Sequence, residues 1–202
     1  MKRQRLLAVL AVSGAVAILC GIGVYWEIDR IAERPAAMPE RPVLGTADVC
    51  SLFDGTLLDR AVPDPTGRSS ELDLSGHPKG NSGHCAVDSS AGSLRIDVEV
   101  VLEVGAGLDP AETRASRELD SYCRDVLAGA VVRPATRSAD GSCSREDGAA
   151  DAVTAVHFGA RKGTRLFRTE YRFGRPVAGD AARTAVRLIE DITAGSTAPS
   201  PR

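Results

Sequence analysis

One uninterrupted apolar run, Leu6 to Trp26, contains no charged side chain and constrains how the whole chain can be placed. Crossing the hydrocarbon core of a bilayer takes about 20 apolar residues, and a helix at the surface of a soluble core keeps a polar face that this run lacks. Basic side chains precede the run and acidic ones follow it: Lys2, Arg3, Arg5, Glu27 and Asp29. The positive-inside rule predicts a cytoplasmic basic tail at 1–5, a transmembrane signal anchor at 6–26 and an extracytoplasmic remainder.

A cleaved signal peptide and a lipid anchor are the alternatives to a transmembrane anchor. The apolar part of a signal peptide covers about 7–15 residues and ends in a small-x-small cleavage site. Here the run is longer, and Tyr25 to Glu27 make a poor cleavage site. Lipid attachment at Cys20 is rejected because Leu19 stands where bacterial lipoprotein signals carry a small residue. We therefore expect an uncleaved, single-pass anchor in the cell membrane.

The charge of the chain narrows its range of partners. There are 25 Lys and Arg against 27 Asp and Glu, and removing the three basic residues of the tail leaves 22 against 27. This net negative charge argues against nucleic acid and against a polybasic lipid-binding face. The expected partners are the lipid bilayer, through Leu6 to Trp26, and an envelope protein. A homodimer is a further option, because Ser13, Ala17 and Gly21 share one helical face and let two helices approach closely.

The cysteines indicate the compartment of the outer part. Cys20 lies within the apolar run, and the other cysteines lie beyond it: Cys50, Cys85, Cys123 and Cys143. An even number in an extracytoplasmic domain is typical of disulfide bonds, and the absence of a Cys-x-x-Cys pair weakens a zinc interpretation. Of the pairings open to them, we predict Cys50–Cys85 and Cys123–Cys143. Each bond then joins a helix to the start of the strand that follows it.

Prolines mark the border between the anchor and the folded part. They interrupt the chain soon after the apolar run, at Pro35, Pro39 and Pro42, so residues 27–45 are expected to form a semi-rigid spacer. The extracytoplasmic domain is expected to cover 46–195 and a disordered tail 196–202.

The first part of the domain is expected to be a broken helix and a loop. Apolar positions from Asp48 to Val62 predict a short helix, a kink at Gly55 and a second turn capped by Thr56. Residues from Pro63 to His84 are rich in Pro, Gly, Ser and Asp and show no sustained period. They are expected to form a long, exposed and mobile loop.

Alternating hydropathy predicts the strands. The clearest pattern runs from Ser93 to Val104, with these side chains facing inward: Leu94, Ile96, Val98, Val100, Leu102 and Val104. Ala152 to Ala160 and Arg165 to Phe173 are expected to form a hairpin. The inward side chains of the hairpin are Val156, Phe158, Phe167, Thr169, Tyr171 and Phe173. Shorter strands are expected at Cys85 to Asp88 and at Cys143 to Glu146, and Pro134 limits Val131 to Ala139 to a loop or an edge strand.

Two longer helices are predicted from caps and apolar stripes. The first opens at Asp109, with Pro110 and Glu112 completing a capping box, and ends near Gly129. Its expected buried stripe is Ala111, Ala115, Leu119, Tyr122 and Val126. The second helix is capped by Asp180 and ends at Gly195. Its expected stripe is Ala181, Ala185, Leu188, Ile189 and Ile192.

These elements predict an α+β fold, in which a small antiparallel sheet is packed by amphipathic helices after one N-terminal transmembrane helix. The order of a helix, strands and an Asp-capped helix occurs twice, and each unit contains one expected disulfide. Two αββα-like half repeats are one interpretation of this order. The other is that such an order is common in α+β domains.

The segment Cys50-Ser51-Leu52-Phe53, followed by Leu57-Leu58 and a later lone cysteine on a strand, resembles a recurring pattern. It is similar to actinobacterial membrane-anchored and lipoprotein-like extracytoplasmic domains of unknown function, over about Asp48 to Val104. The resemblance implies a helix with the first cysteine and a small antiparallel sheet with the second. The chain departs from the pattern because it has a transmembrane anchor in place of a lipobox. The resemblance implies no catalytic residues.

Two sets of polar residues are candidates for a catalytic or metal site. The loop Gly80-Asn81-Ser82-Gly83 is superficially similar to the nucleophile loop of chymotrypsin-like proteases, which need a His base and an Asp from other elements. His77 and His84 are too near in sequence for that role. A metal site built from His77, His84 and Cys85 with Asp73 or Asp88 conflicts with the expected disulfide. A flexible loop explains these residues better.

The outward charges of the strands are expected to form a solvated face. Asp97 and Glu99 face Arg168 or Arg172 across the predicted sheet, in cross-strand ion pairs. We therefore expect no catalytic residue, no cofactor and no metal. The expected function is that of a non-enzymatic envelope binding or accessory module. The alternatives are a hydrolase using Ser82 and a structural subunit of a membrane complex.

Overall fold

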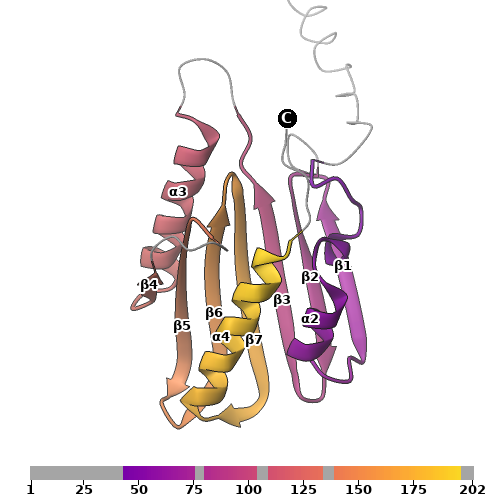
Figure 1. Cartoon of the computed structure of the whole chain (residues 1–202), viewed down its shortest axis with the longest axis vertical. Helices are drawn as coiled ribbons and strands as arrows, with labels where there is room; N and C mark the ends of the chain where they lie inside the picture. Colours follow the sequence, from indigo (N-terminus) through magenta and orange to yellow (C-terminus); the bar gives the residue numbers. More distant parts are fainter. Residues whose placement is uncertain (1–42, 76–79, 104–108, 134–138, 197–202) are drawn as a thin grey trace, which may run out of the picture. The chain divides into compact units, whose positions relative to one another are not determined.

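A seven-stranded antiparallel sheet forms the centre of the computed structural model, in the order β1-β2-β3-β7-β6-β5-β4 (Figure 1). Its strands are β1 (Gly67–Asp73), β2 (Ser82–Ser89), β3 (Gly92–Val100), β4 (Val131–Arg133), β5 (Gly141–Ala149), β6 (Ala152–Lys162) and β7 (Arg165–Val177). The structure describes residues 43–75, 80–103, 109–133 and 139–196. No helix in these ranges is long and apolar enough to cross a membrane. The predicted anchor at Leu6 to Trp26 and the predicted turn at Gly105 to Leu108 lie outside them.

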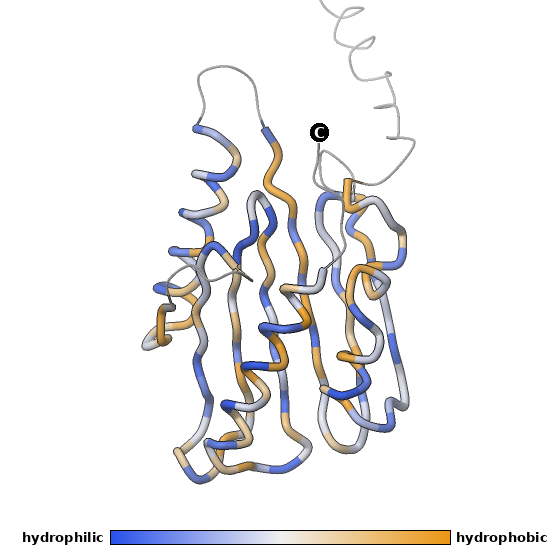
Figure 2. Tube along the Cα trace, viewed as in Figure 1, coloured by the Kyte–Doolittle hydropathy of each residue, from blue (hydrophilic) through white to orange (hydrophobic). Residues whose placement is uncertain are grey.

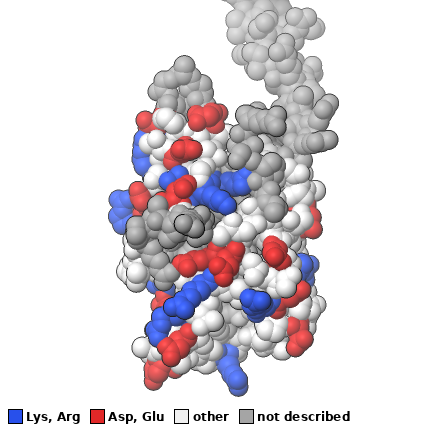
Figure 3. Space-filling model, in the orientation of Figure 1, with Lys and Arg blue, Asp and Glu red and all other residues white. Residues whose placement is uncertain are grey.

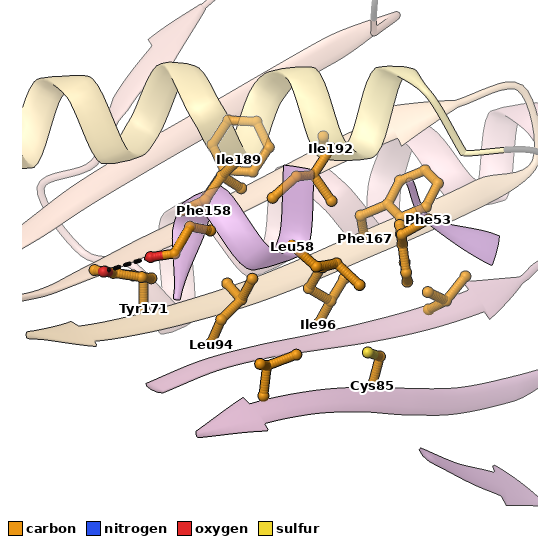
Figure 4. Packing of buried hydrophobic residues seen from close by; sticks show 14 of the residues in the cluster. Phe53, Leu58, Cys85, Leu94, Ile96, Phe158, Phe167, Tyr171, Ile189 and Ile192 are labelled. Atoms are coloured by element: carbon orange, nitrogen blue, oxygen red, sulfur yellow. Dashed lines mark hydrogen bonds between the residues drawn. The ribbon is translucent and has the colours of Figure 1, made fainter. Parts of the chain in front are cut away.

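One face of the sheet is covered by three helical segments: the 3-10 helix η1 (Val49–Leu52) and the α-helices α2 (Gly55–Ala61) and α4 (Gly179–Ala194). Phe53 beside η1 meets Phe167 of β7 edge to face, with ring centroids 6.4 Å apart. The Tyr171 hydroxyl donates a hydrogen bond to the Ala61 carbonyl at 2.8 Å (Figure 4). Each large side chain that is fully buried here contributes about 1.5–3 kcal/mol. This layer therefore holds the main core of the domain.

The opposite face carries a smaller layer, made by α3 (Ala111–Ser121) and the short π-helical turn η2 (Tyr122–Val126). The buried residues of this layer are Val101, Ala111, Ala115, Leu119, Cys123, Leu127, Cys143 and Leu166. The backbone of β6 comes close to the helix at Gly159, where an added Cβ would lie 2.8 Å from the Tyr122 ring. Glycine at this position therefore lets α3 and η2 sit directly on the sheet.

One disulfide joins each layer to the sheet. Cys50–Cys85 links η1 to β2, and Cys123–Cys143 links η2 to β5. This is the pairing predicted from the sequence. The predicted α+β class with an antiparallel sheet is also confirmed, with three α-helices in the part of the chain that the structure describes.

The prediction of a long loop from Pro63 to His84 is wrong. Its middle forms β1, which pairs with β2 over its whole length, and its end forms the start of β2. β1 is an edge strand that is exposed on nearly every residue, so it carries no apolar alternation that would identify it. Figure 2 shows this strand as mostly hydrophilic, in contrast to the alternating colours of β3.

The predicted helix caps are also wrong. The N-cap of α2 is Asp54, whose carboxylate accepts from the Thr56 amide at 2.8 Å. At α3 the amide of Ala111 donates to the Glu103 carboxylate at 3.0 Å, while Asp109 pairs with Arg117. In α4, Asp180 lies inside the first turn and pairs with Arg183. An acidic side chain other than the predicted residue accepts at the start of α2 and of α3, whereas the N-cap of α4, Ala178, has no side-chain hydrogen bond.

The buried stripes of both long helices differ from the predicted ones near one end. In the α3 layer Val126 is 60% exposed and Leu127 is buried, because the π-helical turn adds one residue and rotates the stripe. In α4 the structure buries Ala182, Val186, Ile189, Ile192 and Thr193. Ala181 is exposed instead of buried, and Ala185 and Leu188 are half-buried.

The folded part begins before the predicted border at residue 46. Leu44, which was assigned to the spacer, is buried in the main core, and its amide donates to the Gly80 carbonyl at 2.9 Å. The spacer therefore ends no later than Val43.

Candidate functional site

The helix layers cover the two faces of the sheet unequally. On one face of the sheet, α3 packs on β5, β6 and β7. On this same face, no helix in the described part of the chain packs over β1 and β2. We call the uncovered part the open face. The charged and polar side chains that alternate with the buried ones onto this face are Glu71, Asp73, Ser82, His84, Arg95, Asp97, Glu99, Arg168, Glu170 and Arg172.

A hollow of about 330 Å³ lies on the open face. The residues that line it come from β1, β2, β3 and β7: Asp73, Ser82, Gly83, His84, Asp97, Val98, Glu99, Leu166 and Arg168. Three consecutive strands and β7, which is distant from them in sequence, therefore contribute polar groups to one depression.

Each arginine of the open face is paired with a carboxylate of the same face. Arg95 lies 3.1 Å from Asp97, Arg168 lies 3.1 Å from Glu99, and Arg172 contacts Glu170. Of the predicted cross-strand pairs the structure shows Arg168 with Glu99, whereas Asp97 and Arg172 pair within their own strands. These groups are partly solvated, so each pair contributes only about 0.2–1 kcal/mol.

β1 contributes two carboxylates to the open face. Glu71 is 78% exposed and lies 3.7 Å from the His84 imidazole. The Asp73 carboxylate accepts from the Ser75 amide at 2.8 Å and from the Ser82 hydroxyl at 3.4 Å. Over the described residues of the open face, five carboxylates stand against three arginines, so the formal charge of this face is negative.

Arg168 connects the hollow to α3. Its guanidinium lies 5.7 Å from the centre of the Tyr122 ring and 3.7 Å from the Glu118 carboxylate. Burial and the nearby Glu99 raise the pKa of Glu118. Burial also raises the pKa of Tyr122. Packing of α3 therefore fixes the position of the main cation in the hollow.

The structure brings together only part of the predicted hydrolase set. Ser82 and His84 alternate onto the same side of β2, but the Ser82 hydroxyl donates to Asp73. No hydrogen bond between Ser82 and His84 is found within the described residues, and His77 lies outside them. Such a bond is the geometric sign of an activated serine.

The structure does not bring the proposed metal ligands together. Cys85 is in a disulfide and faces the main core, on the side of β2 opposite to His84. No group of three His, Cys, Asp or Glu side chains able to hold a metal occurs among the described residues.

A second polar cluster lies beside η2. The His157 imidazole lies 2.9 Å from the Asp147 carboxylate, which also accepts from Arg145 at 3.0 Å. Burial raises the pKa of Asp147, but the hydrogen bonds from His157 and Arg145 outweigh it, and the net effect is a lowered pKa. Arg145 also donates to the Val126 carbonyl at 3.3 Å, so the cluster holds η2 against β5.

Sequence reasoning missed Asp73 as part of the hollow because it placed this residue in a loop. Pairing of β1 with β2 sets Asp73 directly opposite Ser82. The face seen in Figure 3 is that of α4, and acidic and basic side chains are interspersed over it. No family model, curated protein or solved structure matches the chain.

Proposed function

We propose that the chain is a membrane-anchored extracytoplasmic module without enzymatic activity, which binds an envelope protein through its open face. The observation that supports this most is the unequal cover of the sheet. One face is sealed by η1, α2 and α4, whereas the other leaves a hollow of about 330 Å³ beside α3. Rigid strands position every side chain around that hollow, which suits recognition.

The charge of the hollow suggests the chemistry of its partner. The described part of the open face carries five carboxylates and three arginines, so its formal charge is negative. A protein segment with Lys or Arg side chains complements this surface. Such complementarity mainly raises the association rate and the specificity.

Site-specific photo-crosslinking in native envelope membranes tests this proposal. The full chain carries a photoreactive residue in place of Ser82 in the hollow, or in place of Arg187 on the exposed side of α4. We expect a discrete protein adduct from position 82 and none from position 187. Equal adducts from both positions, or none from either, would contradict the proposal.

A charge test separates specific binding from mere proximity. Asp97→Lys in the hollow should abolish the adduct from position 82. Asp191→Lys makes the same charge change on exposed α4 and should leave the adduct intact. Equal effects of the two variants would mean that the overall charge of the domain matters, and not the open face.

A hydrolase that uses Ser82 is the competing function, because Ser82 and His84 line the same hollow. A fluorophosphonate probe that labels the full chain, and fails to label Ser82→Ala, would favour it. A structural subunit of a membrane complex is distinguished by native mass spectrometry, where it would appear in a fixed stoichiometry.

The proposal also includes a transmembrane anchor and an origin of the domain from two half repeats. The anchor at Leu6 to Trp26 is supported by its charge-free apolar sequence and its flanking charges. A duplication is supported by the two local disulfides, each of which joins a helical turn to a strand. The proposed relation to actinobacterial anchored domains is supported by the segment Cys50-Ser51-Leu52-Phe53 and the later cysteine on a strand.

A further inference from the structure

Arg165, the first residue of β7, is a buried cation for which the described residues supply no carboxylate. Its side chain is 7% exposed, and its Nη2 is buried with no hydrogen-bond partner. No ion pair joins it to any carboxylate of the described residues. Burial lowers the pKa of Arg165, with no nearby carboxylate opposing that effect. A guanidinium keeps its charge and offers five N–H donors, so its burial is costly unless an anion compensates.

Arg165 lies on the side of the sheet that faces α4. The alternation along β7 puts it on the side of Phe167 and Tyr171, and its strand neighbours are Val100 and Lys162. The Lys162 ammonium donates to the Ala194 carbonyl at 2.9 Å. That bond satisfies one carbonyl at the negative end of α4, which would otherwise disfavour an anion.

A second unused polar group lies just after α4. The Ser196 hydroxyl is buried and has no hydrogen-bond partner among the described residues, and it lies two residues beyond the carbonyl that accepts from Lys162. The end of α4 and the β6–β7 turn thus contribute two cations and one free hydroxyl to the same end of the domain.

The N-terminal segment joins the domain at this same end. The Leu44 amide donates to the Gly80 carbonyl, and the next residue, Asn81, accepts from Val100 at 2.7 Å. Val100 is the strand neighbour of Arg165. Figure 1 shows the first described residues, the tip of β3 and the end of α4 together at the upper end of the domain.

We propose that Arg165, with Lys162 and Ser196, binds a phosphate group at this end of the domain. A planar guanidinium presents parallel N–H donors to two oxygens of a phosphate, a lysine adds a point charge, and a hydroxyl donates to a third oxygen. Two sources share this chemistry, namely a phospholipid headgroup and free phosphate. The lipid source rests on the proposed anchor, which would tether the domain to the bilayer.

Thermal unfolding of the full chain in a phosphate-free detergent tests for the site. Circular dichroism is followed with added inorganic phosphate, and with chloride at matched ionic strength. A ligand at about 100 times its Kd should raise Tm by about 5–10 °C for a chain of this size. We expect phosphate to raise Tm and chloride to leave it unchanged. No difference between the two anions would overturn the proposal.

Variants assign the response to Arg165. Arg165→Met keeps the length of the side chain and should abolish the phosphate response, while Arg165→Lys should retain a weaker one. Arg187→Met removes one exposed arginine from α4 and should respond like the wild type. If phosphate raises the Tm of Arg165→Met as much as that of the wild type, the assignment to Arg165 is contradicted. This holds even if the substitution by itself makes the folded state more stable.

A lipid arm identifies the source. In nanodiscs of phosphatidylglycerol, a headgroup that occupies the site should remove the effect of added phosphate, whereas a site for free phosphate should keep it. The proposed function fails separately from this site. Its failure would appear as a lost adduct at position 82, and failure of the phosphate site as a lost Tm response.

Discussion

The two faces of the sheet share the same strands but differ in what covers them. The side of α4 presents apolar side chains from β2, β3, β6 and β7, and three helical segments seal it. The side of α3 has apolar cover only over β5 to β7, and charges alternate onto the rest. The difference teaches that the hydropathy of the outward positions decides where a helix can pack. The main core of the domain lies on one face, and the other face leaves a polar surface, for which we propose a role in recognition.

The largest expected effect compares neighbouring residues on opposite faces. Phe167→Ala empties a site in the main core and should cost about 3–5 kcal/mol of unfolding free energy. Leu166→Ala removes a buried side chain from the α3 layer and should cost less, near the lower end of about 2–5 kcal/mol, because that smaller layer can relax. Urea unfolding followed by circular dichroism measures both. A larger loss for Leu166→Ala would reverse the proposed ranking of the two layers.

The disulfides offer a second comparison, because each one joins a helical segment to a different face of the sheet. In the chain-entropy model, removing either should cost about 3–4 kcal/mol. Loss of Cys50–Cys85, with a separation of 35 residues, should cost about 0.5 kcal/mol more than loss of Cys123–Cys143, with a separation of 20. Paired Cys→Ala variants in urea give both values. Unequal effects in the opposite order would show that packing, and not chain entropy, dominates.

A smaller effect is expected where α3 touches β6. The methyl group of Gly159→Ala would lie 2.8 Å from the Tyr122 ring, so the ring must move or the helix must shift. We expect a loss of about 1–3 kcal/mol, as for other overpacked sites. Gly141→Ala is the matched control, because its Cβ meets Leu119 at an ordinary 3.5 Å. A neutral Gly159→Ala would mean that the α3 layer is looser than the structure indicates.

The smallest effect is the pH dependence of the cluster beside η2. The pKa of Asp147 is lowered in the folded state, so its contribution to stability is present above its unfolded pKa of about 3.9. That contribution is lost as the pH falls through the folded value. Asp147→Asn should therefore destabilise the chain near pH 6, and the gap to the wild type should close below about pH 4. A gap that stays constant down to pH 2 would contradict this account.

The sequence predicted those parts of the fold in which one side of an element is buried. The alternation predicted from Ser93 to Val104 appears in β3 as far as Val100, and that of Arg165 to Phe173 appears in β7, because the core accepts only apolar side chains. β1 escaped prediction because pairing with β2 stabilises it without burying either of its faces. The π-helical turn at η2 escaped because it depends on packing against β5.

Less of the candidate site could be predicted. Outward charges at the same spacing predicted ion pairs between β3 and β7, and the structure shows one such pair, Arg168 with Glu99. It could not bring Asp73 to the hollow without β1. For Arg165 the signal was present, because the alternation that turns Phe167 and Tyr171 inward also turns Arg165 inward.

Carboxyl footprinting of the full chain tests the central claim most directly, that the open face is the recognition surface and the α4 face is not. Glu71 on the open face is 78% exposed, and Asp180 at the start of α4 is 91% exposed, so both should react when the chain is purified in detergent. In native envelope membranes we predict that labelling of Glu71 falls several-fold while labelling of Asp180 stays unchanged. Protection of Asp180 with full labelling of Glu71 would contradict the account.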